Sequence, residues 1–270
     1  MLEKIKALRK KCLQMSHAGK DGNLQSVFSS MEILFALYNR VMNWSPQIAT
    51  SPARDYLIVS KGQATMGQYV LLSDLGLFSE DELMTFCKFD SRFAMQADRT
   101  KFPEGGIENS AGLLGHGFPM AVGVAMAQKI QGKNNRVYVL AGDGEMNEGT
   151  MWEAAIFAAA HKLSNLCLII DDNHSIQKML DIGSFESKLR AFNFTVATCD
   201  GHNVDEIATS LEKLQTTSEL NQTPACLIAR TIRGYGSKTL MTDPSWFHRF
   251  PNDEELKNLT EEVDLFCEGK

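Results

Sequence analysis

The chain has 270 residues, of which 44% are hydrophobic and 22% are charged. This balance lies near the globular average and excludes a disordered, collagen-like or coiled-coil protein. Its 27 Lys and Arg against 33 Asp and Glu give a net charge of −6, which argues against a general nucleic-acid-binding surface. No run approaches the roughly 18 apolar residues that a membrane-spanning helix needs. We therefore expect neither a nucleic-acid nor a membrane partner.

Two further features predict a cytoplasmic location. The start, MLEKIKALRKKCLQ, is charged and amphipathic and lacks the long apolar core of a signal peptide. The six cysteines are scattered, without a CxxC pair. We interpret them as reduced thiols rather than as disulfide partners or zinc ligands.

Apolar residues at helical spacing alternate with short continuous apolar runs along the chain. The spacing predicts helices over residues 2–16, 29–42 (with Ser30 as N-cap), 63–75, 79–87, 115–130, 146–163, 185–192, 204–215 and 254–266, and an irregular segment over 88–112. Buried strands are expected over residues 55–60, 136–142, 165–171, 194–198 and 225–231. Such alternation is typical of a parallel sheet with helices on both faces. We expect one α/β domain over 1–270 with a helical N-terminal extension.

The densest chemical signal is AGDGEMNEG, residues 141–149, between a predicted strand and a predicted helix. Asp143 falls at the strand's end, where open parallel sheets place ligands. Gly142 and Gly144 let the backbone approach a ligand closely, and the following helix adds its positive N-terminus. The pattern favours a diphosphate at this turn.

A second polar group follows the next predicted strand. That strand ends in Asp171-Asp172-Asn173, which places Asn173 30 residues after Asp143. Because a strand, a helix and a strand bring both strand ends to one edge, Asp143 and Asn173 can offer hard oxygens to one Mg²⁺ or Ca²⁺. The backbone carbonyl of Ser175 is a candidate third ligand.

These residues resemble the thiamine diphosphate motif, in which GDG is followed after about 30 residues by an Asn. Residues 147–173, 112–127 and SKG at 60–62 look like the N-terminal, diphosphate-binding half of a transketolase. SHAG near the start, DGHN at 200–203 and the run ACLIARTIRGYG extend the likeness over about residues 5–255. It is greatest to split transketolases, in which this half is its own polypeptide. The implied fold is the thiamine diphosphate-binding (PP-type) fold.

The resemblance assigns roles to individual residues. It implies that Asp143, Asn173 and the Ser175 carbonyl bind the metal, and that main-chain groups of the 112–114 loop contact the aminopyrimidine. His116 is a further candidate for contacting cofactor or substrate. The implied cofactor-binding residues are Gln63, Gly112, Leu113, Leu114, Gly142, Gly144, Glu145 and Asn173.

The resemblance also implies a partner. Thiamine diphosphate supplies the carbanion chemistry, but the family's catalytic Glu lies on a second, pyrimidine-binding domain for which this chain leaves no room. We therefore expect activity only with a C-terminal subunit that carries the pyrimidine-binding and C-terminal domains. Glu148 and Glu153 match interface acids that couple two active sites, although they could be plain helix-surface acids. A dimer of heterodimers is expected.

Four family histidines are replaced. Lys20 stands where the family has AGH, Gln63 where it has SKGH, Gln96 in MQADR where it has GHPD, and Phe247, followed by His248, where it has Trp-His-Gly. Glutamine can hydrogen-bond a hydroxyl but cannot titrate near pH 7 as histidine can. We expect these positions to contact a substrate with fewer hydroxyl groups than pentose phosphates, such as a 2-oxo acid or a modified sugar.

The predicted function is that of the small subunit of a transketolase-like enzyme, which transfers a two-carbon ketol or related acyl unit from a ketone donor to an aldehyde acceptor. One alternative is the α subunit of a 2-oxo acid dehydrogenase or decarboxylase, which shares GDG and NEG but usually has a longer chain. The other is a non-catalytic scaffold. The lost histidines favour the scaffold, whereas the retained Asp143, Gly144 and Asn173 oppose it.

Overall fold

The fold is built on a parallel sheet of five strands in the residues that this computed structural model describes, 1–175 and 180–266. The strand order is β1-β2-β3-β5-β4, and every neighbouring pair is parallel. The predicted parallel α/β fold is therefore confirmed. The strands span Tyr56–Val59 (β1), Val137–Gly142 (β2), Leu166–Asp172 (β3), Thr195–Asp200 (β4) and Ala225–Arg230 (β5).

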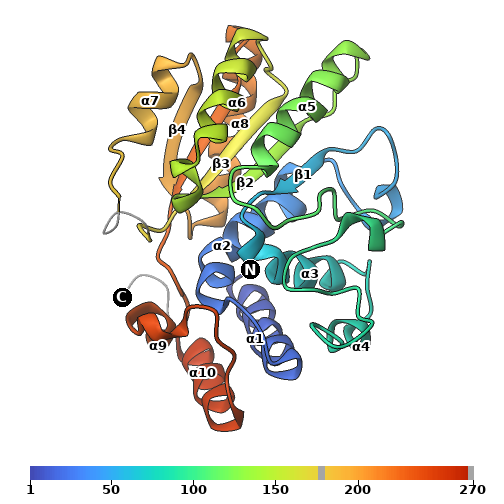
Figure 1. The fold of residues 1–270 in the computed structure, drawn as a ribbon, viewed down its shortest axis with the longest axis vertical. Helices are drawn as coiled ribbons and strands as arrows, with labels where there is room; N and C mark the ends of the chain where they lie inside the picture. Colours follow the sequence, from blue (N-terminus) through green and yellow to red (C-terminus); the bar gives the residue numbers. More distant parts are fainter. Residues whose placement is uncertain (176–179, 267–270) are drawn as a thin grey trace.

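Alternate residues along each strand supply two hydrophobic cores, one on each face of the sheet. Val137 and Val139 pack with α5, α6 and α7, whereas Tyr138 and Leu140 pack with α1, α2, α3 and α8. Figure 1 shows α5, α6 and α7 around the sheet in the upper half and α1 and α10 below it. These helices span Leu2–Gly19 (α1), Leu24–Ala36 (α2), Thr65–Asp74 (α3), Gly117–Ile130 (α5), Gly149–Ala160 (α6), Phe185–Ala191 (α7), Val204–Asn221 (α8) and Asp253–Leu265 (α10).

The second helix differs from the sequence expectation. It begins at Leu24 after the N-cap Asn23, so the prediction that it starts at 29 with Ser30 as its cap is wrong. Ser30 lies inside the helix, where its hydroxyl donates to the Ser26 carbonyl four residues earlier. A serine can satisfy itself this way in mid-helix, which is why a cap-like residue did not mark the start. A π-helical turn, Leu37–Val41, replaces the expected last α-helical turn.

Other boundaries differ where a short turn replaces a helical one. The expected helix over 146–163 becomes a 3₁₀ turn, Gly144–Asn147, followed by α6. The expected helix over 79–87 shrinks to α4, Glu80–Leu83, although Ser79 forms its capping box with Glu82. The helix α9, Lys238–Thr242, was not expected. Residues 88–112 lack regular structure except for a 3₁₀ turn at Arg99–Lys101.

The topology places the ends of β2 and β3 side by side. Gly142 pairs with Asp171 in the parallel register, so the turns that follow the two strands open at the same edge of the sheet. This edge faces the helices α1 and α2 in the lower half of Figure 1. Cys12, Cys87, Cys167, Cys199 and Cys226 are free thiols, and Cys267 lies outside the described residues. Among the described helices, none has both the length and the apolarity to cross a membrane.

Candidate functional site

A cavity of about 110 Å³ opens where β2 and β3 end. The turn after β2 and the segment after β3 form its floor, and side chains from α2, the β1–α3 connection and the segment after β5 complete its wall. The lining residues are Ser26, Lys61, Gln63, Leu114, Gly142, Asp143, Gly144, Glu145, Asn173, Ser175, Arg233 and Phe247.

The three predicted metal ligands lie together in this cavity. The carboxylate of Asp143 accepts the Ser175 backbone N–H at 2.7 Å, the Ser175 hydroxyl at 2.8 Å and the Gly144 N–H at 2.8 Å. The Asn173 Oδ1 also accepts the Ser175 N–H, at 3.2 Å. Within residues 1–175 and 180–266, three or more His, Cys, Asp or Glu side chains nowhere gather as a metal site. A metal here would therefore rely on one carboxylate, the amide oxygen and main-chain oxygens.

A buried ion pair lies beneath these ligands. Lys61 Nζ contacts the Asp171 carboxylate and also donates to the hydroxyls of Ser29 at 3.1 Å and Ser30 at 3.0 Å. Both charged side chains are almost fully buried, at 6% and 0% exposure. Burial alone would raise the pKa of Asp171, but the attraction of the Lys61 ammonium and the hydroxyl hydrogen bonds bring it below its usual value. The ion pair thus holds the Lys61 side chain at the cavity wall.

Arg233 is a second cation in the wall. It follows β5, and its Cζ lies 5.1 Å from the ring centroid of Phe247. Burial lowers the pKa of Arg233, an effect that the nearby Asp143 carboxylate opposes. Its Nε is buried and makes no hydrogen bond to any residue that the structure describes. Because an unpaired buried donor is costly, this atom points to an anionic ligand in the cavity.

Glu145 joins the turn after β2 to the loop before α5. Its Oε1 accepts the Ser60 hydroxyl and the Gly115 N–H, the latter at 2.8 Å. Its Oε2 is buried without a hydrogen-bond partner in the described part of the chain. Burial raises the pKa of Glu145, although the hydrogen bond from Ser60 opposes that rise.

Of the predicted cofactor residues, Gln63, Leu114, Gly142, Gly144, Glu145 and Asn173 line the cavity. Gly112, Leu113 and His116 instead line a second cavity of about 280 Å³, which Ser60 also lines. There His116 Nδ1 lies 3.0 Å from the Leu114 carbonyl oxygen. The loop over 112–116 therefore borders both cavities.

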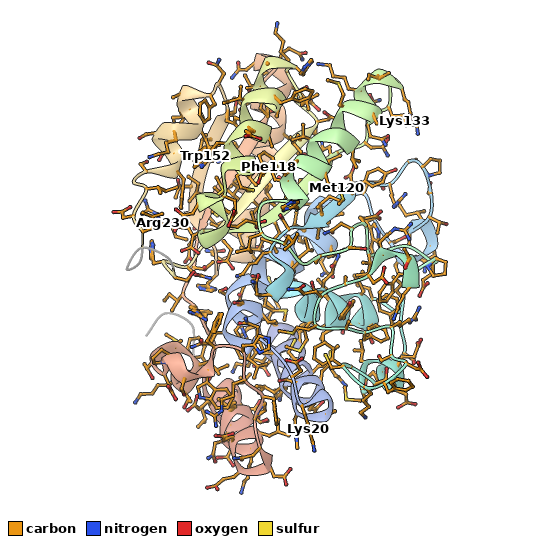
Figure 2. All side chains as sticks on the ribbon, viewed as in Figure 1. Lys20, Phe118, Met120, Lys133, Trp152 and Arg230 are labelled. Carbon is orange, nitrogen blue, oxygen red and sulfur yellow. The ribbon has the colours of Figure 1, made fainter. Side chains whose placement is uncertain are left out.

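The predicted substrate residues are only partly brought together. Phe247 is in the cavity wall, and the Gln96 side chain lies against Gly112. Lys20 is exposed at the end of α1, and Figure 2 shows it at the bottom of the molecule, away from the sheet. His248 is exposed and does not line the cavity.

The predicted interface acids lie on an open surface. Glu148 and Glu153 are both exposed at the start of α6. Large apolar side chains are exposed on the same helix and on α5: Ile156 is 53% exposed, Phe157 46% and Met120 44%. Figure 2 shows Met120 on α5. The face therefore combines acids with uncovered apolar area.

Comparison with known proteins decides the family. The model of the family "Transketolase, thiamine diphosphate binding domain" matches residues 1–261. The chain belongs to this family. The resemblance seen in the sequence is thereby confirmed for the transketolase family and for thiamine diphosphate binding.

Relatives show which part of a transketolase this chain represents. It is 36% identical over 268 residues to one of the subunits of apulose-4-phosphate transketolase from Actinobacillus succinogenes, covering 97% of this chain and 95% of that protein. It is 34% identical over 221 residues to 6-deoxy-6-sulfo-D-fructose transketolase subunit SqwG of Clostridium sp. (strain MSTE9), covering 80% and 78%. The structure of transketolase from Leishmania mexicana matches with a TM-score of 0.87 at 24% identity, over 98% of this chain but 41% of that one.

The chain is therefore an N-terminal transketolase-like subunit, and the relatives that it covers almost in full are themselves named as single subunits. Three residues that line the cavity, Ser26, Lys61 and Arg233, were not predicted from the sequence. Lys61 lies in the SKG motif and Arg233 in the run ACLIARTIRGYG, so the resemblance could have predicted both. Ser26 gave no signal, because the start of α2 was placed too late.

Proposed function

We propose that this subunit holds thiamine diphosphate and a divalent cation, Mg²⁺ or Ca²⁺, in the cavity at the ends of β2 and β3. With its partner it transfers a two-carbon ketol or related acyl unit from a ketone donor to an aldehyde acceptor. The main support is the opposition of charges in one small cavity. The Asp143 carboxylate faces the cations Lys61 and Arg233, as a bound cation and a diphosphate together require.

The oxygen donors fit a hard divalent cation. Asp143, the Asn173 Oδ1 and the Ser175 carbonyl supply the ligands that Mg²⁺ and Ca²⁺ prefer. Lys61, Arg233 and Gln63 would hold the diphosphate, and the Gly144 N–H, which donates to Asp143 in this structure, is a main-chain donor at the same turn. Main-chain groups of Gly112, Leu113 and Leu114 would meet the aminopyrimidine, and Glu145 would support that loop from below.

When bound, the cofactor would supply the carbanion chemistry of the reaction. This chain's own contribution is to bind and orient. Asp143 and Asn173 would hold the cation at the diphosphate end, and the side chains of Lys61 and Arg233 would neutralise the remaining negative charge. The proton-transferring Glu would come from the partner.

We infer that the donor is a modified ketose rather than an ordinary pentose phosphate. Phe247 places an apolar ring at the cavity rim, 60% exposed, and Gln63 and Gln96 lie where the resemblance leads us to expect histidines. Two relatives are named for unusual sugars, apulose 4-phosphate and 6-deoxy-6-sulfofructose. The positions of Lys20 and His248 outside this cavity do not support a role for them in substrate binding. His116 lines only the second cavity.

The partner would carry the pyrimidine-binding and C-terminal domains, and the assembly would be a dimer of heterodimers. The exposed face of α5 and α6, with Glu148 and Glu153, supports this arrangement because an uncovered apolar surface favours association. The proposal includes a single thiamine diphosphate-binding domain over residues 1–270. It also includes a cytoplasmic location, consistent with scattered, unpaired cysteines.

Calorimetry with thiamine diphosphate and Mg²⁺ tests the proposal, using the chain alone and after assembly with its partner. Binding should appear or tighten in the assembly and be lost in Asp143→Asn. The matched control, Asp81→Asn, changes an exposed aspartate on α4 and should bind like the wild type. Absence of binding in both preparations would refute the cofactor site. Normal turnover of xylulose 5-phosphate with ribose 5-phosphate would refute the modified donor.

A further inference from the structure

Ser29 is a fully buried residue of α2, and its hydroxyl contacts Asn173, one of the proposed metal ligands. The Asn173 side-chain amide donates from Nδ2 to the Ser29 Oγ at 3.2 Å, while its Oδ1 accepts the Ser175 N–H. The two ends of this amide therefore face different partners. Which end faces the cavity decides whether Asn173 presents an oxygen or an NH₂ group to a cation.

The surroundings of Ser29 determine that orientation. Its hydroxyl carries one hydrogen, which lies within reach of two acceptors, the Asp171 carboxylate at 2.8 Å and the Ser26 carbonyl at 3.1 Å. The Lys61 ammonium, which can only donate, points at the same Oγ from 3.1 Å. With its hydrogen directed to the carboxylate, the Ser29 oxygen is left to accept.

The opposite amide orientation would be unfavourable at both ends. It would place the Asn173 NH₂ group against the Ser175 N–H, donor facing donor, and its oxygen against a hydroxyl whose hydrogen is already used. Buried polar groups without hydrogen-bond partners are destabilising. The series of contacts from Lys61 through Asp171 and Ser29 therefore directs the Asn173 side-chain oxygen, not its nitrogen, to the cavity.

We infer that Ser29 is a positioning residue, which fixes the Asn173 amide as an oxygen ligand before the metal arrives. This inference rests on the proposed function, because it needs a cation bound by Asn173. Partners of this kind, which touch a ligand and not the metal, typically change metal affinity by about 10- to 100-fold when removed.

Ser30 provides a matched control on the same helix. It is equally buried, and its hydroxyl donates to the same Asp171 carboxylate at 2.8 Å and to the Ser26 carbonyl at 2.9 Å. It also receives the Lys61 ammonium, at 3.0 Å. Within residues 1–175 and 180–266, however, it makes no hydrogen bond to Asn173. Removing either hydroxyl thus disturbs the same ion pair. Only the loss of the Ser29 hydroxyl also removes a hydrogen bond that orients the Asn173 side-chain amide.

The experiment compares Ser29→Ala with Ser30→Ala in the full chain assembled with its partner. Mg²⁺ is titrated calorimetrically at saturating thiamine diphosphate, Mn²⁺ binding is followed by electron paramagnetic resonance, and the Tm of each variant is recorded. We expect similar falls in Tm. We expect Ser29→Ala to weaken Mg²⁺ and Mn²⁺ binding by about 10- to 100-fold and Ser30→Ala to bind close to the wild type.

Equal metal affinities in the two variants would overturn the inference, because the hydroxyls would then matter only for stability. If Ser29→Ala does not fold, Ser29→Cys is compared with Ser30→Cys, since a thiol leaves no cavity but accepts hydrogen bonds weakly. The same contrast is expected, and wild-type metal binding by Ser29→Cys would refute the inference. If the wild type and Ser30→Ala also bind no Mg²⁺ and thiamine diphosphate, the proposed function itself fails. If only the Ser29 variants lose metal affinity, the proposed function stands and the positioning role of Ser29 is supported.

Discussion

The buried pair of Lys61 and Asp171 offers a demanding test of how this site is held together. Lys61→Met keeps much of the aliphatic stem but leaves the Asp171 carboxylate, which is 0% exposed, without its counter-ion. Breaking a buried pair on one side usually costs about 3–5 kcal/mol. The hydroxyls of Ser29, Ser30 and Thr231 still donate to this carboxylate. We therefore expect a loss near 3 kcal/mol, the lower end of that range, or roughly a factor of 10² in the folding equilibrium.

Urea unfolding of the chain, followed by circular dichroism, measures this loss. Lys10→Met is the control, because Lys10 and Asp264 form an ion pair of similar length, 2.6 Å, but are 33% and 50% exposed. An exposed pair contributes about 1 kcal/mol or less. Adding Asp171→Asn to Lys61→Met removes the isolated charge and should recover most of the stability. The reasoning is refuted if Lys61→Met costs no more than Lys10→Met, or if the double variant is as unstable as the single one.

Three further predictions concern the cavity. Arg233→Met should weaken thiamine diphosphate binding about 10- to 100-fold, since a hydrogen bond to a charged group contributes about 1.5–3 kcal/mol. Calorimetry compares this variant with Arg40→Met, which changes an exposed arginine, and equal affinities would contradict the prediction. Burial raises the pKa of Glu145 above its ordinary 4.5, so the folded chain binds the extra proton and its stability falls as pH rises from 4.5 through the folded-state pKa. Glu145→Gln should flatten that fall in a Tm-against-pH series of the metal-free chain, and parallel curves would count against it. Phe247→His should raise kcat/KM for xylulose 5-phosphate by up to about 10²-fold in the assembled enzyme, because it restores a polar contact. Phe250→His, at another exposed phenylalanine, should leave kcat/KM unchanged. If Phe247→His gives no gain, Phe247 does not determine donor specificity.

The sequence alone was sufficient for the sheet and for the centre of the site. Continuous apolar runs identified β1, β2, β3 and β5, since strands buried on both faces have no polar side to show. The edge strand β4 was also expected, although its residues are only partly buried. Asp143 and Asn173 were predicted to be neighbours because parallel strands joined by a helix end at the same edge. The GDG turn and the residues around it were enough to predict the family.

Residues that approach from other elements were harder to predict. The start of α2 was placed too late because Ser30 looks like a cap, and its partner Asp171 is 141 positions away in the chain. Lys20 resembled a site residue by its local motif, yet α1 carries it to the far end of the molecule. Local patterns describe a residue's neighbours along the chain, not the direction in which its helix carries it.

The pairing of Lys61 with Asp171 and the contact of Ser29 with Asn173 were decided only by the tertiary structure. A lysine, an aspartate and a serine are most often solvated surface residues in a sequence. Here the packing of α2 against the ends of β1 and β3 removes them from water. Once buried, each polar atom must find a partner within reach. That requirement is imposed by the fold and not by any local pattern, and it arranges the groups behind Asp143 and Asn173.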